Sequence, residues 1–238
     1  MKNEIFSNEE KNLKKAEKSA EKRAKEIAKY YETESGRIIA CKKTGSSPKF
    51  FDEIAEIGER AFENNRLIKN VELPENISYI GDRAFCGCKY LSSVKITSAP
   101  DYMGDGVFSD CANLKSASLP FSLKGIERQT FYNCGKLEDI EIPEGVNKIG
   151  ESAFDGCYSL KQTEIPEGVE IIGDFAFYGC EKIEKIAIPK SVREIGVSAF
   201  ERCSLKEVTL PKRFKRRRKK IFGKKLGGLF SKVKFTYI

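Results

Sequence analysis

Phenylalanine recurs at a fixed interval of 23 residues through most of this chain, and this repeat limits the possible folds more than any other feature of the sequence. The seven residues are Phe62, Phe85, Phe108, Phe131, Phe154, Phe177 and Phe200. A unit of this length is too short to form an independent domain and too long for a coiled-coil heptad. It is typical of one coil of a solenoid, in which each unit buries its apolar side chains only by stacking on its neighbours. We number the coils 1 to 7 after these phenylalanines.

Several other residue types repeat in step with the phenylalanine. An aliphatic residue or Met lies five positions before it, Gly follows that residue in six of the seven coils, and a small or short residue directly precedes the phenylalanine. Leu or Ile lies six positions after it in coils 1 to 6. Cys lies three positions after it in coils 2 to 7, at Cys88, Cys111, Cys134, Cys157, Cys180 and Cys203, and Asn65 takes this place in coil 1.

Each unit contains the patterns of short strands. The pairs Val71 with Leu73 and Ile140 with Ile142 alternate with polar residues as a strand does, and a proline usually follows, which cannot continue a sheet ladder. A second aliphatic pair, such as Val146 with Ile149, indicates another short strand or extended run before the Gly. The following segment, ESAFDGCYSL in coil 5, predicts a brief helical or 3₁₀ turn. The fold class is therefore an α/β repeat solenoid with short strands.

Composition excludes several classes of function. The chain of 238 residues has no His, which excludes Ser-His-Asp and Cys-His catalysis and histidine-ligated metal sites. No nucleophile has a base beside it in the repeat pattern, and no insertion is long enough to form a pocket. We therefore expect no enzyme activity, no metal or other cofactor, and no small-molecule substrate.

The consensus x-I-P-x-x-V-x-x-I-G-x-x-A-F-x-x-C-x-x-L-x-x-I, which covers about residues 50–211, resembles the BspA-type leucine-rich repeat. The resemblance implies a right-handed leucine-rich-repeat solenoid that recognises proteins or glycans. It also implies a role like that of family members on the surfaces of host-associated bacteria and some protists, which act as adhesins in host or cell–cell interaction.

The opening residues favour a different location. MKNEIFSNEEKNLKK has no apolar stretch of the length that a secretory signal needs. The sequence as written therefore predicts a cytoplasmic protein, unless a leader has been removed, whereas the family resemblance implies the cell surface.

The six repeating cysteines predict a structural ladder of thiols. A small, weakly polar side chain at this position can sit under a turn and contact a backbone group of its own or an adjacent coil. Parallel Cβ vectors give poor disulfide geometry, and a line of sulfurs does not converge on a metal ion. Cys86 directly follows Phe85 and is expected to be more exposed, and Cys41 also lies outside the ladder.

The outward positions of the V-x-L strands form the candidate binding face, because a sheet holds such columns rigidly in register. The predicted residues are Asn70, Glu72, Ser93, Lys95, Asp139, Glu141, Gln162, Glu164, Lys185 and Glu207. Asp139, Glu141 and Glu164 make the middle of this face acidic. The two columns contain no aromatic residue, which leaves a merely solvated sheet face as the alternative.

Coil 3 departs from the consensus. Pro100 stands where Val or Ile is usual, and Asp101, Tyr102 and Asp105 lie nearby. This segment is expected to bulge and to contact a partner or a cation, or else to reflect simple drift of the repeat.

The segments before the solenoid are predicted from composition. Residues 1–35 form a charged N-terminal helix, because residues 8–34 are rich in Ala, Glu and Lys and contain no Gly or Pro. Its apolar stripe is mostly alanine, which favours a solvated or lightly docked helix over a coiled coil. Residues 36–49 form a linker or an N-terminal cap, and residues 50–211 form the seven-coil solenoid.

The C-terminal residues 212–238 contain twelve of the 43 Lys and Arg and none of the 35 Asp and Glu. Phe222 falls where an eighth, degenerate coil would place its phenylalanine, with Phe214 in the place of a buried Val. The segment therefore predicts a basic cap, a contact for nucleic acid or anionic membrane, or a targeting signal. Arg217 falls at an inward position, so the basic run is expected to loop out. The candidate polyanion contacts are Lys212, Arg213, Lys215, Arg216, Arg217, Arg218, Lys219 and Lys220.

Two functions remain open from the sequence. The first is a non-enzymatic recognition module that presents its polar strand face to a protein or glycan. The second is attachment to nucleic acid or an anionic membrane through the basic C-terminal residues. The steepness of the salt dependence of binding distinguishes them, because phosphate contacts release counterions.

Overall fold

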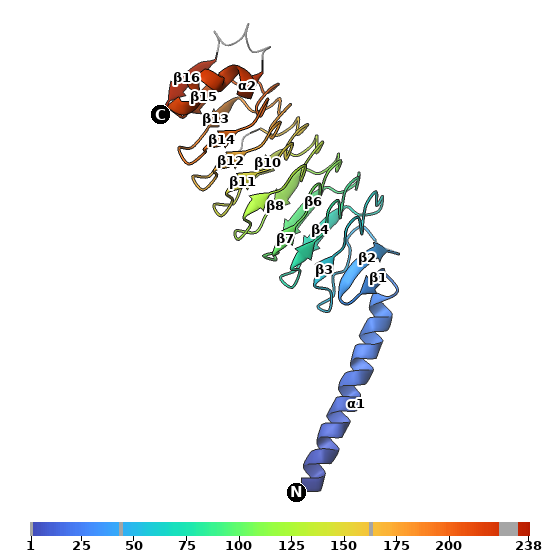
Figure 1. Ribbon diagram of the computed structural model, residues 1–238. Helices are drawn as coiled ribbons and strands as arrows, with labels where there is room; N and C mark the ends of the chain where they lie inside the picture. The colour runs from blue at the N-terminus through green and yellow to red at the C-terminus, as the bar shows by residue number, and fades with distance from the viewer. Residues whose placement is uncertain (1, 43–44, 162–163, 224–232) are drawn as a thin grey trace.

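The protein is an elongated stack of coils with a helix projecting from its N-terminal end and a compact cap at its C-terminal end (Figure 1). The computed structural model describes residues 2–42, 45–161, 164–223 and 233–238. The solenoid predicted from the phenylalanine repeat is confirmed, and its core runs the length of the stack as one continuous apolar cluster.

The strands form two faces that run along the stack. The short-strand face consists of β3 (Glu56–Ile57), β5 (Tyr79–Ile80), β7 (Tyr102–Met103), β9 (Gly125–Ile126), β11 (Lys148–Ile149), β12 (Ile171–Ile172) and β14 (Glu194–Ile195). The long-strand face consists of β4 (Asn70–Leu73), β6 (Ser93–Ile96), β8 (Ser116–Ser118), β10 (Asp139–Ile140), β13 (Lys185–Ala187), β15 (Glu207–Leu210) and β16 (Lys234–Tyr237). All pairings between coils are parallel, and equivalent residues of neighbouring coils lie side by side, as Val71 and Val94 do.

The repeating phenylalanines stack on one another in the core. Centroids of successive rings from Phe62 to Phe200 lie between 4.9 and 5.7 Å apart, and the rings are nearly parallel. Tyr31 packs edge-on against the first ring of this ladder. Because each ring contacts the ring of the coil before and after it, the side chain that identifies the repeat also joins the coils.

In the turn around each phenylalanine, successive backbone amides donate hydrogen bonds alternately to the next coil and to their own turn. In coil 4, the amides of Gln129, Phe131 and Asn133 donate to carbonyls of the next coil, whereas Thr130 and Tyr132 donate to carbonyls three residues earlier. The latter bonds are the 3₁₀ type that the sequence predicts. Gln129 and Asn133 have positive φ angles of 56° and 59°, however, so the segment is a series of turns and no helix forms.

The glycine that follows the aliphatic residue allows the coils to approach closely. A Cβ added to Gly150 would lie 2.6 Å from the backbone nitrogen of Arg128 in the preceding coil. Gly is therefore needed at this position for backbone contact between coils. In coil 4 Glu127 occupies this position.

The ladder of strands is interrupted on both faces. On the short-strand face β7 pairs with β5 and β9 pairs with β11, but β7 and β9 do not pair with each other. The side chain of Glu127 explains this gap. At this position it keeps the backbone of coil 4 farther from coil 3, whereas a coil with Gly here lies close to the coil before it. On the long-strand face the interruption lies between β10 and β13, because the described residues of coil 5 form no strand there.

The N-terminal cap begins earlier than the sequence predicts. Helix α1 (Lys2–Ile27) ends at Ile27 and not at residue 35, and an antiparallel hairpin of β1 (Tyr31–Glu34) and β2 (Arg37–Cys41) follows it. The helix stops there because the chain turns inward to bury Ile27 and Tyr31. The hydroxyl of Tyr31 donates a hydrogen bond to the Lys49 carbonyl oxygen at 2.7 Å. Strand β2 pairs with β3 of coil 1 and so covers the first coil.

The C-terminal residues form a degenerate eighth coil. The ring of Phe222 lies 5.8 Å from that of Phe200 and extends the phenylalanine ladder, and β16 pairs with β15. The basic run does not loop out as predicted. It forms the 3₁₀ helix η1 (Lys212–Arg217) and helix α2 (Arg218–Phe222), which bury Phe214 and Ile221 over the last coil.

Candidate protein-binding face

The two predicted columns lie in register on the long-strand face. Asn70, Ser93, Ser116 and Asp139 follow one another across β4, β6, β8 and β10, and Lys185 and Glu207 lie side by side on β13 and β15. Gln162 lies outside the described residues. The structure therefore places the other nine predicted residues on one side of the solenoid, and almost all of them are exposed.

The two ends of this face are neutralised by contacts between neighbouring coils. Lys95 Nζ lies 2.6 Å from Glu72 Oε1, and Ser93 Oγ donates to Asn70 Oδ1 at 2.7 Å. Towards the C-terminus, Lys185 Nζ lies 3.3 Å from Glu207 Oε2. These charged groups already have partners, so they offer little unbalanced charge to a ligand.

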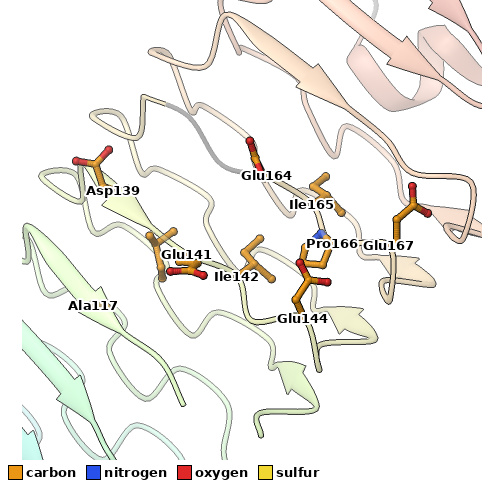
Figure 2. Close-up of a pocket in the computed structure, with 10 residues that line it drawn as sticks. Ala117, Asp139, Glu141, Ile142, Glu144, Glu164, Ile165, Pro166 and Glu167 are labelled. Atoms are coloured by element: carbon orange, nitrogen blue, oxygen red, sulfur yellow. The ribbon is translucent and has the colours of Figure 1, made fainter. Parts of the chain in front are cut away.

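The middle of the face contains an open hollow, which we call the acidic groove. Its volume is about 680 Å³ and its carboxylates are Asp139, Glu141, Glu144, Glu164 and Glu167. None of the five forms an ion pair within the part of the chain that the structure describes; the nearby Lys161 is paired with Glu138 at 2.7 Å. Figure 2 shows Ile142 in the middle of the groove, with Glu141 and Glu144 close to it and Asp139 and Glu167 towards the two ends.

The groove coincides with the interruption in the long-strand ladder. No backbone hydrogen bond joins Glu141 or Ile142 to Glu164 or Ile165, whereas regular coils are joined at the corresponding strands. Ala117 also lines the groove, at a position where β4 and β6 have valine. The missing strand pairing and the small side chain together leave room above an apolar floor, which consists of Ala117, Ile140, Ile142, Ile165 and Pro166.

Next to the groove lies an exposed aromatic residue, Phe121, that was not predicted from the sequence. Phe121 is 75% exposed and lies ten residues before Phe131, the position that Glu144 and Glu167 occupy in the next two coils. The coils are in close contact here, since a Cβ on Gly145 would lie 2.9 Å from the Phe121 carbonyl oxygen. The sequence does carry a sign of Phe121, because it places an aromatic residue at a repeat position where most other coils have a charged residue.

The carboxylates of the groove are spread along the face and do not converge on a point. Among the described residues, no group of three or more Cys, Asp or Glu side chains is arranged to hold a metal ion. The groove therefore presents negative charge and hydrogen-bond acceptors along an apolar strip, an arrangement suited to an extended cationic ligand.

The six cysteines of the predicted ladder are all buried, and each donates a hydrogen bond across a coil boundary. Cys134 Sγ lies 3.2 Å from the Phe108 carbonyl oxygen, and the other five make the same contact at 3.2 to 3.3 Å. Burial raises the pKa of the Cys88 and Cys203 thiols to about 12. These thiols therefore stay protonated at neutral pH and act as donors to the adjacent coil.

Two residues related to the ladder differ from expectation. Cys86 is 3% exposed, so the prediction that it is more exposed was wrong. Asn65 does not donate to a backbone carbonyl of the preceding layer as the cysteines do, and its Nδ2 instead donates to Cys41 Sγ of the N-terminal hairpin at 3.9 Å. Its Oδ1 accepts from the amides of Leu67 and Ile68 in its own turn, because the longer amide side chain reaches these groups.

The predicted polyanion contacts lie in the C-terminal cap, and half of them contact coil 7 or strand β16. Arg213 donates to the Lys190 carbonyl oxygen and Arg217 to that of Ile195. The Arg218 guanidinium lies 5.1 Å from the Phe235 ring centroid, and Lys215 Nζ lies 5.4 Å from that of Tyr237. The remaining four, Lys212, Arg216, Lys219 and Lys220, are exposed.

Coil 3 keeps its register despite Pro100. Strand β7 forms at the expected place and pairs with β5, so the predicted bulge is absent within the coil. Asp105 is only partly exposed, whereas Asp101 and Tyr102 are exposed.

Stacked coils with short parallel strands, a buried cysteine ladder and an exposed strand face define a leucine-rich-repeat solenoid. The sequence profile described as "BspA type Leucine rich repeat region" matches residues 41–161 and 147–237, with 6 copies of the repeat. The chain belongs to this family, and the resemblance seen in the sequence is confirmed. Comparison with curated proteins finds no match.

Solved structures of bacterial leucine-rich-repeat proteins have the same fold. A leucine-rich repeat protein from Bacteroides ovatus is 31% identical with a TM-score of 0.70, and the match covers 80% of this chain and 47% of that one. A leucine rich cell surface protein from Faecalibacterium prausnitzii is 26% identical with a TM-score of 0.61, over 72% and 49% of the two chains. The T. pallidum leucine-rich repeat protein is 27% identical with a TM-score of 0.63, over 79% and 88%. The chain thus spans about half the length of the first two.

Within the described residues, no helix is both long enough and apolar enough to cross a lipid bilayer.

Proposed function

We propose that this protein is a non-enzymatic recognition module that binds a protein ligand in the acidic groove of its long-strand face. Proteins of this repeat type generally serve as surface or interaction modules. The ligand is an extended segment that carries Lys or Arg together with apolar side chains. The observation that carries the proposal is the group of five carboxylates that form no ion pair among the described residues, on a face where Glu72 is paired with Lys95 and Glu207 with Lys185.

Charge and shape both support such a ligand. Carboxylates held side by side without cationic partners repel one another, and a cationic segment relieves that repulsion while it is steered towards the groove. Ile140, Ile142 and Ile165 in the floor are 4–8% exposed, so they add only a narrow apolar strip between the carboxylates. Phe121 beside the groove supplies the kind of exposed aromatic anchor that protein interfaces favour. A neutral glycan has no positive charge and is therefore not attracted electrostatically to the five carboxylates.

Selection from a displayed library of random peptides tests the proposal. The bait is the full chain, and the matched bait carries Asp139→Lys, Glu141→Lys and Glu164→Lys. We expect peptides rich in Lys, Arg and apolar residues to be enriched on the first bait only, with an affinity that falls as salt increases. Equal enrichment on both baits would contradict the proposal. A control bait with Glu72→Lys and Glu207→Lys on the same face should select the same peptides as the unchanged chain.

A second candidate function is supported by the exposed basic residues of the cap, among them Lys212, Arg216, Lys219 and Lys220. They lie at one end of the molecule and could hold nucleic acid or an anionic membrane. Replacement of all four by Gln should lower the salt concentration at which the protein elutes from heparin if this function operates. The control replaces four exposed lysines of α1, Lys14, Lys15, Lys18 and Lys22, by Gln. Equal elution of the cap variant and the unchanged protein would remove this candidate.

The partner is met at the cell surface, as the similar cell surface protein from F. prausnitzii suggests, with an encounter inside the cell as the alternative. Labelling of intact source cells with a membrane-impermeant biotin reagent distinguishes the two. A labelled chain places the interaction at the surface, and a chain that is labelled only after the cells are lysed places it inside.

A further inference from the structure

A stack of two tyrosines lies on the short-strand face, away from the acidic groove. The rings of Tyr79 and Tyr102 are 4.9 Å apart with an angle of 15° between their planes. On the outer side of Tyr79, the guanidinium of Arg37 lies 4.8 Å from the ring centroid. One end of this stack is therefore already covered by a guanidinium from the N-terminal hairpin.

The other end of the stack carries no further ring among the described residues, although the Glu127 carboxylate lies close to the position that faces it, since a Cβ added to Gly125 would be 2.8 Å from Glu127 Oε1. Gly125 follows Tyr102 in the column of outward positions, because it is the first residue of β9 as Tyr102 is of β7. It has no side chain to place on the Tyr102 ring. The ladder is interrupted between these two strands, where Glu127 replaces the close-packing glycine. Tyr102 is accordingly 45% exposed.

The orientation of the Tyr102 ring is fixed. Its hydroxyl donates to Asp82 Oδ1 at 3.0 Å, and the amide of Asp105 donates to the same oxygen at 3.0 Å. A ring held in this way loses little conformational freedom when a ligand stacks on it, which favours binding.

The surroundings of Tyr102 carry negative charge. Asp82, Asp101 and Asp105 form no ion pair within the described part of the chain, and burial together with the charges of Asp82 and Glu127 raises the pKa of Asp105. The nearby cations are engaged elsewhere, Lys148 with Glu127 at 3.4 Å and Arg128 with Glu151 at 3.6 Å. An added cation is therefore favoured beside this ring.

We propose that the open face of Tyr102 is a docking site for an arginine side chain of a cationic protein partner, which completes a stack of Arg37, Tyr79, Tyr102 and the incoming guanidinium. Arg37, which is also ion-paired with Glu56, shows that a guanidinium can lie against this stack when a carboxylate is beside it, and the aspartates without an ion pair among the described residues supply the complementary charge. Arginine fits better than lysine because its planar group stacks on an aromatic ring and bonds to carboxylates in two directions. The site lies on a different face from the acidic groove and does not depend on it.

Amide NMR titration of the full ¹⁵N-labelled chain tests the proposal, with Nα-acetyl-arginine amide as the probe. We expect the resonances of Tyr102, Met103 and Gly125 to shift with a dissociation constant about three- to fivefold lower than for Nα-acetyl-lysine amide. Shifts at Glu141 and Ile142 report any separate binding in the acidic groove. Equal affinity of the two probes at Tyr102, or shifts confined to the groove, would overturn the proposal.

Variants separate stacking from general structural effects. Tyr102→Ala should abolish the shift at Gly125, whereas Tyr102→Phe, which keeps the ring, and Tyr90→Ala, which removes another exposed tyrosine, should retain it. Gly125→Tyr should also abolish binding, because the added ring covers Tyr102. Retained binding in Tyr102→Ala contradicts the site, and so does a neutral oligosaccharide such as maltohexaose that shifts these resonances more strongly than arginine does.

Discussion

The ring of Phe131 lies 5.5 Å from the ring of Phe154 and is tilted by only 11° from it. Both side chains are fully buried, and the backbone amide of Phe131 donates to the carbonyl of Ala153, directly before the second ring. One residue thus joins two coils through its side chain and its backbone. The position is therefore one at which both the side chain and the backbone hold neighbouring coils together.

Removal of a ring from the middle of this ladder should strongly destabilise the protein. Phe131→Ala leaves a cavity between two neighbours that cannot move together, so the free energy of unfolding should fall by about 3–5 kcal/mol. Urea denaturation followed by far-ultraviolet circular dichroism measures the loss. Phe121→Ala is the matched control, because Phe121 is exposed and its removal should change stability by about 0.5 kcal/mol or less. Similar losses for both variants would contradict the ladder as the core of the fold.

The close approach of the coils at Gly150 predicts that a larger residue at this position destabilises the protein. An added methyl group meets backbone atoms of Glu127 and Arg128, which cannot rotate away as a side chain could. Gly150→Ala should therefore lower the free energy of unfolding by about 1–3 kcal/mol. Gly45→Ala should have little effect, since no atom of the described residues lies within 4 Å of its added Cβ. Equal denaturation midpoints for the two variants would show that the coils can separate at this position without cost.

The buried cysteines predict a specific loss of stability in alkaline solution. Burial raises the pKa of all six ladder thiols above their ordinary value of 9.0. Above pH 9 the unfolded chain loses these protons while the folded chain keeps them, so stability falls as pH rises. Cys157→Ala should reduce the slope of stability against pH by about one proton between pH 9 and 11. Urea midpoints measured under reducing conditions from pH 7.5 to 11 provide the test, and parallel curves for the variant and the unchanged protein would contradict it.

The C-terminal residues should be required for stability whether or not they bind a polyanion. A chain that ends at Pro211 lacks Phe214, Ile221 and Phe222, which are buried over the last coil, and should lose roughly 5 kcal/mol. Thermal unfolding and light scattering should reveal a lower midpoint and association through the uncovered coil. The variant with Gln at Lys212, Arg216, Lys219 and Lys220 keeps the apolar side chains and should unfold near the original midpoint. An unchanged midpoint in the shortened chain would refute the capping role.

The sequence predicted the parts of the fold that repeat. A single interval of 23 residues places Phe108, Cys111 and Leu114 and their counterparts at the same points of successive coils, and neighbouring coils must then superpose these side chains. The strand face and the buried thiols follow from the same register. The alternating backbone of the turn did not follow, because Gln129, Ser152 and Phe175 adopt positive φ angles although none of them is glycine. Bonds to the next coil impose that conformation, and composition carries no sign of it.

The candidate sites were harder to predict because they lie where the repeat fails. Ala117 in place of valine and Glu127 in place of glycine are single changes in the consensus, yet they accompany the acidic groove and the open face of Tyr102. A departure from the consensus indicates that the surface of that coil is changed, but it does not predict the shape of the changed surface. The N-terminal boundary was missed for a related reason, since Tyr31 lies in a segment of helical composition and is drawn into the core by tertiary contacts.

The proposed recognition function is tested most directly by amide NMR titration of the full chain with the cationic, amphipathic peptide acetyl-Lys-Leu-Lys-Leu-Lys amide. We predict salt-sensitive shifts at residues 139–142 and at residues 164, 165 and 167 that disappear in the variant with Lys at Asp139, Glu141 and Glu164. Shifts that persist in that variant, or that fall only on residues outside the acidic groove, would contradict the assignment of the groove as the binding surface.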